Sequence, residues 1–520
     1  MKAMTKILGL LLGILCLHLL SIQAGTQLKF KYKTLFSEMR TLLIVLLFLF
    51  SCISPEQKSN NTKPDKPNVL FISVDDLRPE LGCYGYDHMH TPNIDRLASK
   101  GMVFRNAYCQ QAVCSPSRNT VMTGLRPDSL KIYDLGTNFR KFNPDVVTLS
   151  QYFMQQGYRS ESIGKIYHIW HGNHDDSLSW SIKPWNPWDE PLKIDGISRE
   201  DTIDLHTSYP KVGDKRLAWY RSEVPDINLN DTRITNHAIK RLNELKDRPF
   251  FLGVGYLKPH LPFVAPDRFW DLYDPVNIVI PGETPPEGSP PFAINNSGEL
   301  LCCYYKFDTM PVSDDVAKNL IHGYYASVSY IDHEIGRLIG SLEELGLMEN
   351  TIIVIWGDHG WKLGNYGQWC KHTAFEYDAR TTLIFRTPWM DPASNATNSL
   401  AELLDIYPTL CEEAGLPVPD FVQGKSLSPI LKNPEESVKD FALSQWPKGD
   451  VMGYSLRTKD YRFVSWQKNR NPDSVVAIEL YDHKEGFEEV VNAADFPENK
   501  EIVQRLSNKL NEVRIKARTD

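Results

Sequence analysis

The sequence lacks an excess of positive charge, because its 520 residues carry a formal net charge of -8. Proteins that bind nucleic acid through a global positive field have the opposite sign, so we expect no nucleic-acid partner. An anionic substrate is not excluded, since a local cluster of basic side chains and metal can dominate one pocket. The hydrophobic fraction of 42% and the charged fraction of 23% are ordinary for a globular protein. The length allows two or three domains.

Cysteine is sparse, and no two cysteines have the C-x-x-C spacing. The absence of such pairs argues against a zinc ribbon. Nine cysteines in so long a chain also argue against a small scaffold held together by disulfides. The sequence fixes no disulfide pairing, and it contains no internal repeat.

Neither apolar run near the amino terminus has the length expected of a membrane span. Ile7 to Leu20 and Leu42 to Cys52 suit the apolar region of a signal peptide better. Leu49-Phe50-Ser51-Cys52 resembles a bacterial lipobox, so we expect lipidation of Cys52 and a true start at Met39. The protein would then be exported, to the periplasm or as a lipoprotein anchored in the outer membrane. A first signal followed by a hydrophobic anchor is the alternative.

Three apolar runs predict strands that are buried on both faces: Val69 to Val74, Pro249 to Tyr256 and Thr351 to Trp356. Helical patterns separate them, around Ile234 to Leu245 and from Tyr325 to Leu345. This alternation predicts an α/β fold with a large, mostly parallel central sheet flanked by helices. Polar residues follow each run, and ligands of such sheets gather beyond the carboxyl ends of the strands.

The predicted organisation has four parts: a leader (1–52), a flexible tether (53–66), a catalytic domain (67–435) and a smaller α+β subdomain with an antiparallel sheet (436–520). Two long stretches with little periodicity, Gly172 to Asp226 and Pro281 to Pro311, are candidates for pocket walls or for ordinary surface insertions.

Cys114-Ser115-Pro116-Ser117-Arg118, continued by Thr123-Gly124, matches the pattern C-x-P-S-R-x-x-x-x-T-G. Further phrases accompany it: VDDLRPELGCYG, SIGKIYH, GYLKPHLPF and GDHGWKLGNYGQWCKH. Together they resemble the type I sulfatases of the alkaline phosphatase superfamily, and within them the iduronate-2-sulfatase branch. The resemblance spans nearly the whole chain from Asn68 onward, and it implies an alkaline phosphatase-like fold.

The resemblance implies that a maturation enzyme oxidises Cys114 to formylglycine, whose hydrate attacks sulfur. It also implies one calcium ion, held by Asp75, Asp76, Asp358 and His359 together with the modified Cys114. Carboxylate oxygens suit calcium or magnesium, whereas a histidine ligand such as His359 better suits a transition metal. Of these metals, the resemblance implies calcium.

Roles for the remaining site residues also follow from the resemblance. Arg118 would hold the hydrate, Lys165 and Lys371 would bind the sulfate, and His168 would assist the nucleophile. His260 would be the general acid for the departing sugar alcohol. Taken alone, a lysine is usually a solvated surface charge and a histidine a structural hydrogen-bonding group.

The expected substrate is a sulfated oligosaccharide, with a 2-O-sulfated uronic acid as the sulfated unit. Two alternatives stay open: a phosphate mono- or diesterase on the same scaffold, and a non-catalytic lipoprotein that binds glycans. Relatives in the resembled branch tend to carry histidine where this chain has Leu257, so we expect a contact to the sugar to be absent here.

Overall fold

In the computed structural model, strand β1 (Asn68–Val74) lies inside the central sheet and is buried along its whole length. Its parallel neighbours are β7 (Phe250–Tyr256) and β9 (Thr351–Gly357), and β3 (Arg159–Gly164) pairs in parallel with β7. These strands contain all three apolar runs of the sequence, and every residue of β7 and β9 is buried as well.

Four further strands complete the eight-stranded sheet, whose order is β12-β2-β13-β9-β1-β7-β3, with β14 pairing with β2. They are β2 (Met102–Tyr108), β12 (Arg380–Thr381), β13 (Leu383–Arg386) and β14 (Ala396–Glu402). β13 runs antiparallel to both β9 and β2, and β12 runs antiparallel to β2, so the sheet is mixed on this side. The predicted α/β class with a mostly parallel central sheet is confirmed.

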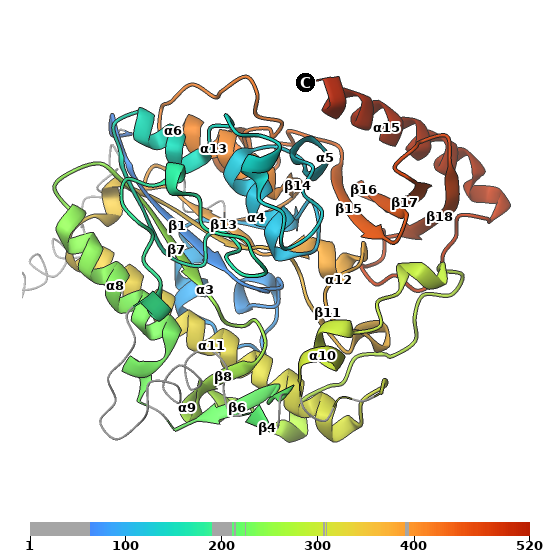
Figure 1. The fold of residues 1–520 in the computed structure, drawn as a ribbon, viewed down its shortest axis with the longest axis horizontal. Coiled ribbons are helices and arrows are strands. Elements are labelled where there is room, and N and C mark those ends of the chain that lie inside the picture. The colour runs from blue at the N-terminus through green and yellow to red at the C-terminus, as the bar shows by residue number, and fades with distance from the viewer. Residues whose placement is uncertain are drawn as a thin grey trace, which may run out of the picture. The chain divides into compact units, whose positions relative to one another are not determined.

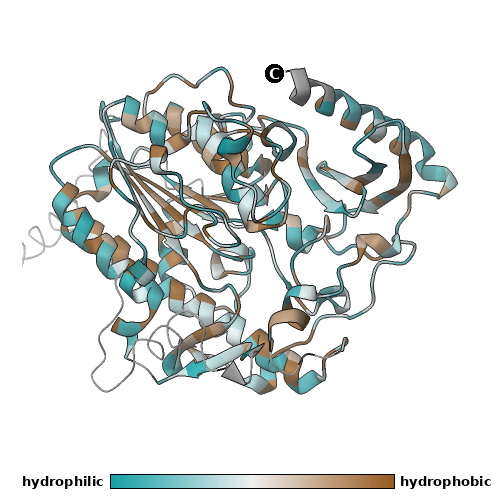
Figure 2. Cartoon of the chain, viewed as in Figure 1, coloured by the Kyte–Doolittle hydropathy of each residue, from teal (hydrophilic) through white to brown (hydrophobic). Residues whose placement is uncertain are grey.

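Helices cover both faces of the sheet because alternate side chains of each strand point to opposite sides (Figure 1). Leu70 and Ile72 of β1 join one core cluster, with α8 (Asn230–Leu245), α11 (Asp314–Glu344) and α3 (Pro92–Ala98). Val69 and Phe71 join the other, with α4 (Cys114–Thr123), α6 (Leu149–Gln155) and α13 (Ile406–Glu413). Figure 2 shows the hydrophobic strands between these layers.

A second, four-stranded antiparallel sheet lies near the carboxyl end and has the order β15-β16-β17-β18. Its strands are β15 (Ala442–Lys448), β16 (Val451–Arg457), β17 (Tyr461–Lys468) and β18 (Val475–Asp482). Helix α15 (Lys500–Thr519) packs against it through Leu506 and Leu510. The antiparallel sheet followed by a helix is therefore present, as predicted from the sequence.

The structure describes residues 63–519 apart from 190–210, 213–214, 224, 305–306, 308 and 391–394. The predicted leader, with Met39 and Cys52, and residues 53–62 of the predicted tether lie outside these residues. No helix within them is long and apolar enough to span a bilayer. Adjacent cysteines Cys302 and Cys303 form a disulfide at the end of α10 (Gly298–Cys303).

Candidate active site

The carboxyl ends of four neighbouring strands bring the predicted site residues together. Val74, the last residue of β1, pairs with Gly357 of β9 and Tyr256 of β7. Asp75 and Asp358 therefore leave the sheet side by side, and the segment that contains His260 leaves it next to them. Lys165 follows the last residue of β3 at the same edge. This is where ligands bind in open α/β sheets.

Asp76 adopts a left-handed backbone conformation, with φ of 60°. Such a conformation is uncommon outside glycine and concentrates at functional sites. The turn lets the Asp76 amide donate to Asp358 Oδ1 at 2.9 Å. The Asp76 carboxylate oxygen Oδ1 lies 3.3 Å from His359 Nε2. Asp75 and Asp76, although adjacent in the chain, can therefore approach the same group of ligand atoms from different directions.

Cys114 is the first residue of helix α4, whose ten residues are all buried. Its sulfur lies 3.5 Å from both Asp75 Oδ1 and His359 Nε2. Burial and the charge of Asp75 raise the pKa of the thiol well above its usual value. An unmodified Cys114 therefore stays protonated and is a poor nucleophile. The helix amino terminus, by contrast, favours a negatively charged ligand at this position.

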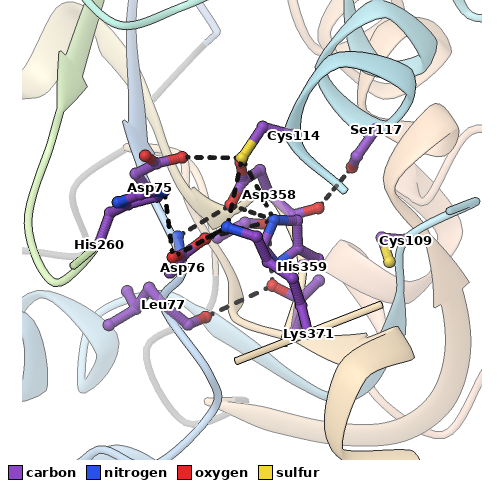
Figure 3. A network of polar contacts seen from close by, with 12 residues as sticks. Asp75, Asp76, Leu77, Cys109, Cys114, Ser117, His260, Asp358, His359 and Lys371 are labelled. Atoms are coloured by element: carbon purple, nitrogen blue, oxygen red, sulfur yellow. Dashed lines mark hydrogen bonds and ion pairs between the residues drawn. The ribbon is translucent and has the colours of Figure 1, made fainter. Parts of the chain in front are cut away.

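The buried ligand atoms of Asp76, Cys114, Asp358 and His359 all lie within 4.8 Å of one another. Asp75 belongs to a neighbouring group with Asp76 and His260 (Figure 3). Burial, together with the negative charges of Asp75 and Asp358, raises the pKa of Asp76 well above its usual value, although Lys371 opposes this. A carboxylate that resists ionisation in this way is what a bound cation would relieve. Carboxylate oxygens with one histidine fit a divalent metal ion.

Three basic side chains surround the carboxylates. Lys165 and Lys371 each place Nζ 3.8 Å from the Cys114 sulfur. Lys165 also pairs with Asp75, and Lys371 Nζ lies 2.8 Å from Asp76 Oδ1. Burial alone would discharge Lys371, but Asp76 and other nearby anions raise its pKa well above the usual value, so its charge is retained.

Arg118 connects two of the carboxylates. Its Nη2 donates to Asp75 Oδ1 and its Nε to Asp358 Oδ2, both at 2.9 Å. The guanidinium is fully buried, and this fork fixes the carboxylates that follow β1 and β9 relative to each other.

The two predicted histidines lie in different surroundings. The segment after β3 is not helical, so His168 sits in a tight loop, where its Nε2 contacts His171 Nδ1 at 3.0 Å. Burial, with the nearby charge of Lys165, lowers the pKa of His168 to about 2, which keeps it neutral. His260 donates from Nδ1 to the Leu261 carbonyl at 2.6 Å, which turns Nε2 toward Asp76 Oδ2, 3.8 Å away.

Glu299 of α10 is a site residue that the sequence did not reveal. Its Oε1 lies 3.3 Å from His260 Nε2, and its Oε2 lies 3.6 Å from Lys371 Nζ. It falls within the aperiodic stretch 281–311, where no motif singles it out, although that stretch was a candidate pocket wall. Side-chain exposures of 27% for His260 and 18% for Glu299 contrast with at most 3% for Lys371 and Asp76, so His260 and Glu299 are the more solvent-accessible members of the site.

Two protein families match this chain. The sulfatase family model matches residues 67–416, and the model of the N-sulphoglucosamine sulphohydrolase carboxyl-terminal region matches 364–516. Human iduronate 2-sulfatase is 36% identical over 84% of this chain and 90% of its own length. A sulfatase of Formosa agariphila is 29% identical over 88% of each chain.

Solved structures share the fold at lower identity. A phosphonate monoester hydrolase from Silicibacter pomeroyi superposes with a TM-score of 0.73 at 22% identity, covering 87% of this chain and 96% of its own. A structure described as a 2-O GAG sulfatase gives 0.63 at 21% identity, covering 87% and 93%. These two likenesses concern the fold alone. The match of the family model over most of the chain, together with human iduronate 2-sulfatase, shows that this chain belongs to the sulfatase family and is a sulfuric ester hydrolase.

Proposed function

We propose that this sulfatase hydrolyses the 2-O-sulfate ester of a uronic acid in a sulfated glycan. The observation that best supports this proposal is the pair Lys165 and Lys371, each with Nζ 3.8 Å from the Cys114 sulfur. Two fixed positive charges flank the reacting position, where negative charge builds up on the sulfate oxygens during transfer. The match to human iduronate 2-sulfatase supports the uronic acid.

A calcium ion and a formylglycine derived from Cys114 complete the proposed centre. The group formed by Asp76, Asp358 and His359 beside position 114 would hold the ion, and Asp75 borders it. When bound, such an ion makes a hydroxyl group at residue 114 easier to deprotonate. Arg118 keeps Asp75 and Asp358 in place through its two hydrogen bonds.

His260 is the proposed general acid. Because Nδ1 donates to the Leu261 carbonyl, the acid is the doubly protonated ring, which delivers its second proton from Nε2 to the ester oxygen. Burial and the charge of Lys371 lower the pKa of His260, and the Glu299 carboxylate, 3.3 Å from Nε2, favours the protonated form. The departing sugar then leaves as an alcohol instead of an alkoxide. His168 is proposed to assist the nucleophile as a neutral hydrogen-bonding group, since a pKa lowered to about 2 makes it a poor proton acceptor.

Leu257 bears on the sugar specificity. Its side chain packs against the core on one face of the sheet, and its amide donates to Asp231 Oδ1 at 2.6 Å. A leucine offers no polar group to a sugar hydroxyl, so recognition of the uronic acid depends on other residues at the opening.

The test is sulfate release from a panel of 2-O-sulfated uronates, 6-O-sulfated hexosamines and algal sugar sulfates, after co-expression with a maturation enzyme. Phosphate mono- and diesters belong in the same panel. We expect release from the 2-O-sulfated uronates and none from Cys114→Ala. Release from another sugar alone would overturn the substrate assignment. Turnover of the phosphate esters alone, or of nothing at all once conversion of Cys114 is confirmed by mass spectrometry, would overturn the sulfatase proposal.

We also propose that the protein is exported and carries a lipid on Cys52, as its lipobox resemblance indicates. Labelling with a radioactive fatty acid in a bacterial host should mark the wild type and not Cys52→Ser. Label that persists in the variant would reject this anchor.

A further inference from the structure

Trp170 is an exposed aromatic side chain beside the catalytic centre. It lies in the loop that follows β3, five residues after Lys165, and 42% of its surface is accessible. The Lys165 Nζ lies 4.9 Å from the centre of the Trp170 ring and 3.8 Å from the Cys114 sulfur. Lys165 therefore lies between the Trp170 indole and the Cys114 sulfur and contacts both.

Neighbouring side chains hold the Trp170 ring. Trp188 approaches it with ring centres 5.5 Å apart, and the buried His168 approaches edge-on at 5.9 Å. His168 in turn stacks on His171, whose backbone is left-handed with φ of 60°. An indole that is supported on two sides loses little conformational entropy on binding, and this favours a preformed recognition surface.

An exposed indole beside a cluster of buried charged groups favours a ligand with an apolar face of its own. The Cys114 sulfur is approached within 3.8 Å by Asp75, His359, Lys165 and Lys371, which suit the sulfate and not the carbon skeleton behind it. A pyranose ring has such a face, made of its axial C–H groups. The ring that bears the sulfate is one ester oxygen away from sulfur, so it must lie close to the two lysines.

We propose that Trp170, supported by Trp188, is the stacking platform for the pyranose ring that carries the sulfate. This inference rests on the proposed hydrolysis of sugar sulfates and deepens it. In this arrangement Lys165 binds the sulfate oxygens while the adjoining indole binds the sugar face. Binding of the sugar, and not of the sulfate, is what Trp170 contributes.

The experiment compares Trp170→Ala and Trp170→Phe with the wild type on whichever sugar sulfate of the panel is cleaved. Phe496→Ala is the matched control, since Phe496 is 44% exposed and lies in the carboxyl-terminal region. We expect KM to rise about tenfold in Trp170→Ala, the loss of one aromatic contact, with kcat within about threefold. Trp170→Phe should recover much of the affinity, and Phe496→Ala should match the wild type.

Inorganic sulfate serves as the second probe. Its inhibition constant should be the same in Trp170→Ala and wild type, because the lysines and carboxylates are untouched. Binding of the sugar sulfate to Cys114→Ala, with and without Trp170→Ala, gives a readout that needs no turnover. If Trp170→Ala leaves both KM and sugar binding unchanged, Trp170 is not the stacking platform. Equal weakening of sulfate and sugar sulfate would assign Trp170 a structural role instead. If the wild type cleaves no sugar sulfate of the panel, the proposed function is wrong, and this result is distinct from a failure of the Trp170 proposal alone.

Discussion

Asp358 takes part in three interactions at the centre of the site. Its Oδ1 accepts the Asp76 amide, its Oδ2 accepts Arg118 Nε, and its Oδ1 lies 3.7 Å from His359 Nε2. It is fully buried, so no water replaces a lost partner. The position of this carboxylate therefore fixes both the turn at Asp76 and the donor group around Cys114.

Asp358→Asn should lower calcium affinity by about a hundredfold and abolish sulfate release, because it removes one anionic oxygen donor from the metal group. Isothermal titration with calcium and metal analysis of the purified protein measure this directly. Asp267→Asn, which breaks an exposed ion pair with Arg221, is the control and should leave calcium binding unchanged. Calcium content equal to that of the wild type in Asp358→Asn would show that the metal group is wrongly assigned.

His260→Ala should reveal the general acid through its dependence on the leaving group. A sugar alcohol needs a proton as it departs, whereas a nitrophenolate does not. We expect kcat on a sugar sulfate to fall about a hundredfold or more, the usual range for general acid catalysis, and kcat on nitrophenyl sulfate to fall far less. Equal losses on both substrates would mean that His260 acts by positioning and not by proton transfer.

At the scale of single elements, ion pairs and hydrogen bonds hold the loop after β3, which contains Asp175 and Asp176, in place. Asp176 pairs with Arg140 at 2.7 Å, and Asp175 Oδ1 accepts the indole N–H of Trp180 at 2.9 Å. The other oxygen of Asp175 is buried without a hydrogen-bond partner among the described residues. Burial raises the pKa of Asp175 to about 7.

This raised pKa makes the loop sensitive to pH. The folded protein keeps a proton on Asp175 that the unfolded chain loses above about pH 4, so the group's favourable contribution is complete below that pH and is lost as the pH rises toward 7. Asp175→Asn removes the titration and keeps the acceptor for Trp180. We expect it to be more stable than the wild type by up to about 4 kcal/mol at pH 8 and nearly equal to it at pH 4. Urea unfolding at both pH values measures the difference, and a pH-independent difference would contradict it.

The elements that the sequence predicted best are those with an unbroken apolar pattern. β1, β7 and β9 are buried on both faces, so their sequences need no alternation, and the polar residues that end them identify the site edge. Helix α11 was predicted only from Tyr325, although it begins at Asp314. Its first turns already carry Ala317, Leu320 and Ile321 at helical spacing, all buried, so the sequence pattern extends further upstream than predicted. Gly323, a residue that disfavours helix interiors, interrupts the pattern just before Tyr325.

Glu299 and Trp170 could not be predicted in the same way. Each lies outside the matched motifs, on a short helix or a loop without periodicity. Their places are set by the packing of segments far apart in the chain, as in the approach of Glu299 to His260 and of Trp170 to Trp188. A single sequence contains no local signal for contacts of this kind.

At the scale of the whole molecule, the carboxyl-terminal sheet supports both halves of the active site. The Gln445 amide of β15 donates to the Gln110 carbonyl at 2.8 Å, just before the segment that contains Cys114. On the other side, Arg462 of β17 donates to the Ala374 carbonyl at 2.9 Å, three residues after Lys371. The sheet thus restrains the segments next to Cys114 and Lys371, the proposed nucleophile position and one of the two lysines proposed to bind sulfate.

Arg462 is also the centre of a buried ionic cluster. It pairs with Glu376 and with Glu489, the latter at 2.7 Å, and all three side chains are at most 1% exposed. Burial opposes the charge of Glu376, but Arg457 and Arg462 hold its pKa well below the usual value. The Glu376 carboxylate stays ionised because the two guanidinium groups are present, so loss of Arg462 destabilises the buried cluster.

Arg462→Met should therefore lower the free energy of unfolding by about 3 to 5 kcal/mol, since it leaves two buried carboxylates with too little positive charge. Lys509→Met, which breaks a more exposed pair with Asp440 in the same region, should cost at most about 1 kcal/mol. Because the sheet contacts the segments next to Cys114 and Lys371, we expect one cooperative transition in both variants, with sulfatase activity lost along it. Guanidinium unfolding followed by fluorescence and by residual activity provides the measurement. An early transition in Arg462→Met that leaves activity intact would instead show that the carboxyl-terminal sheet unfolds as an independent domain, one that does not support the active site.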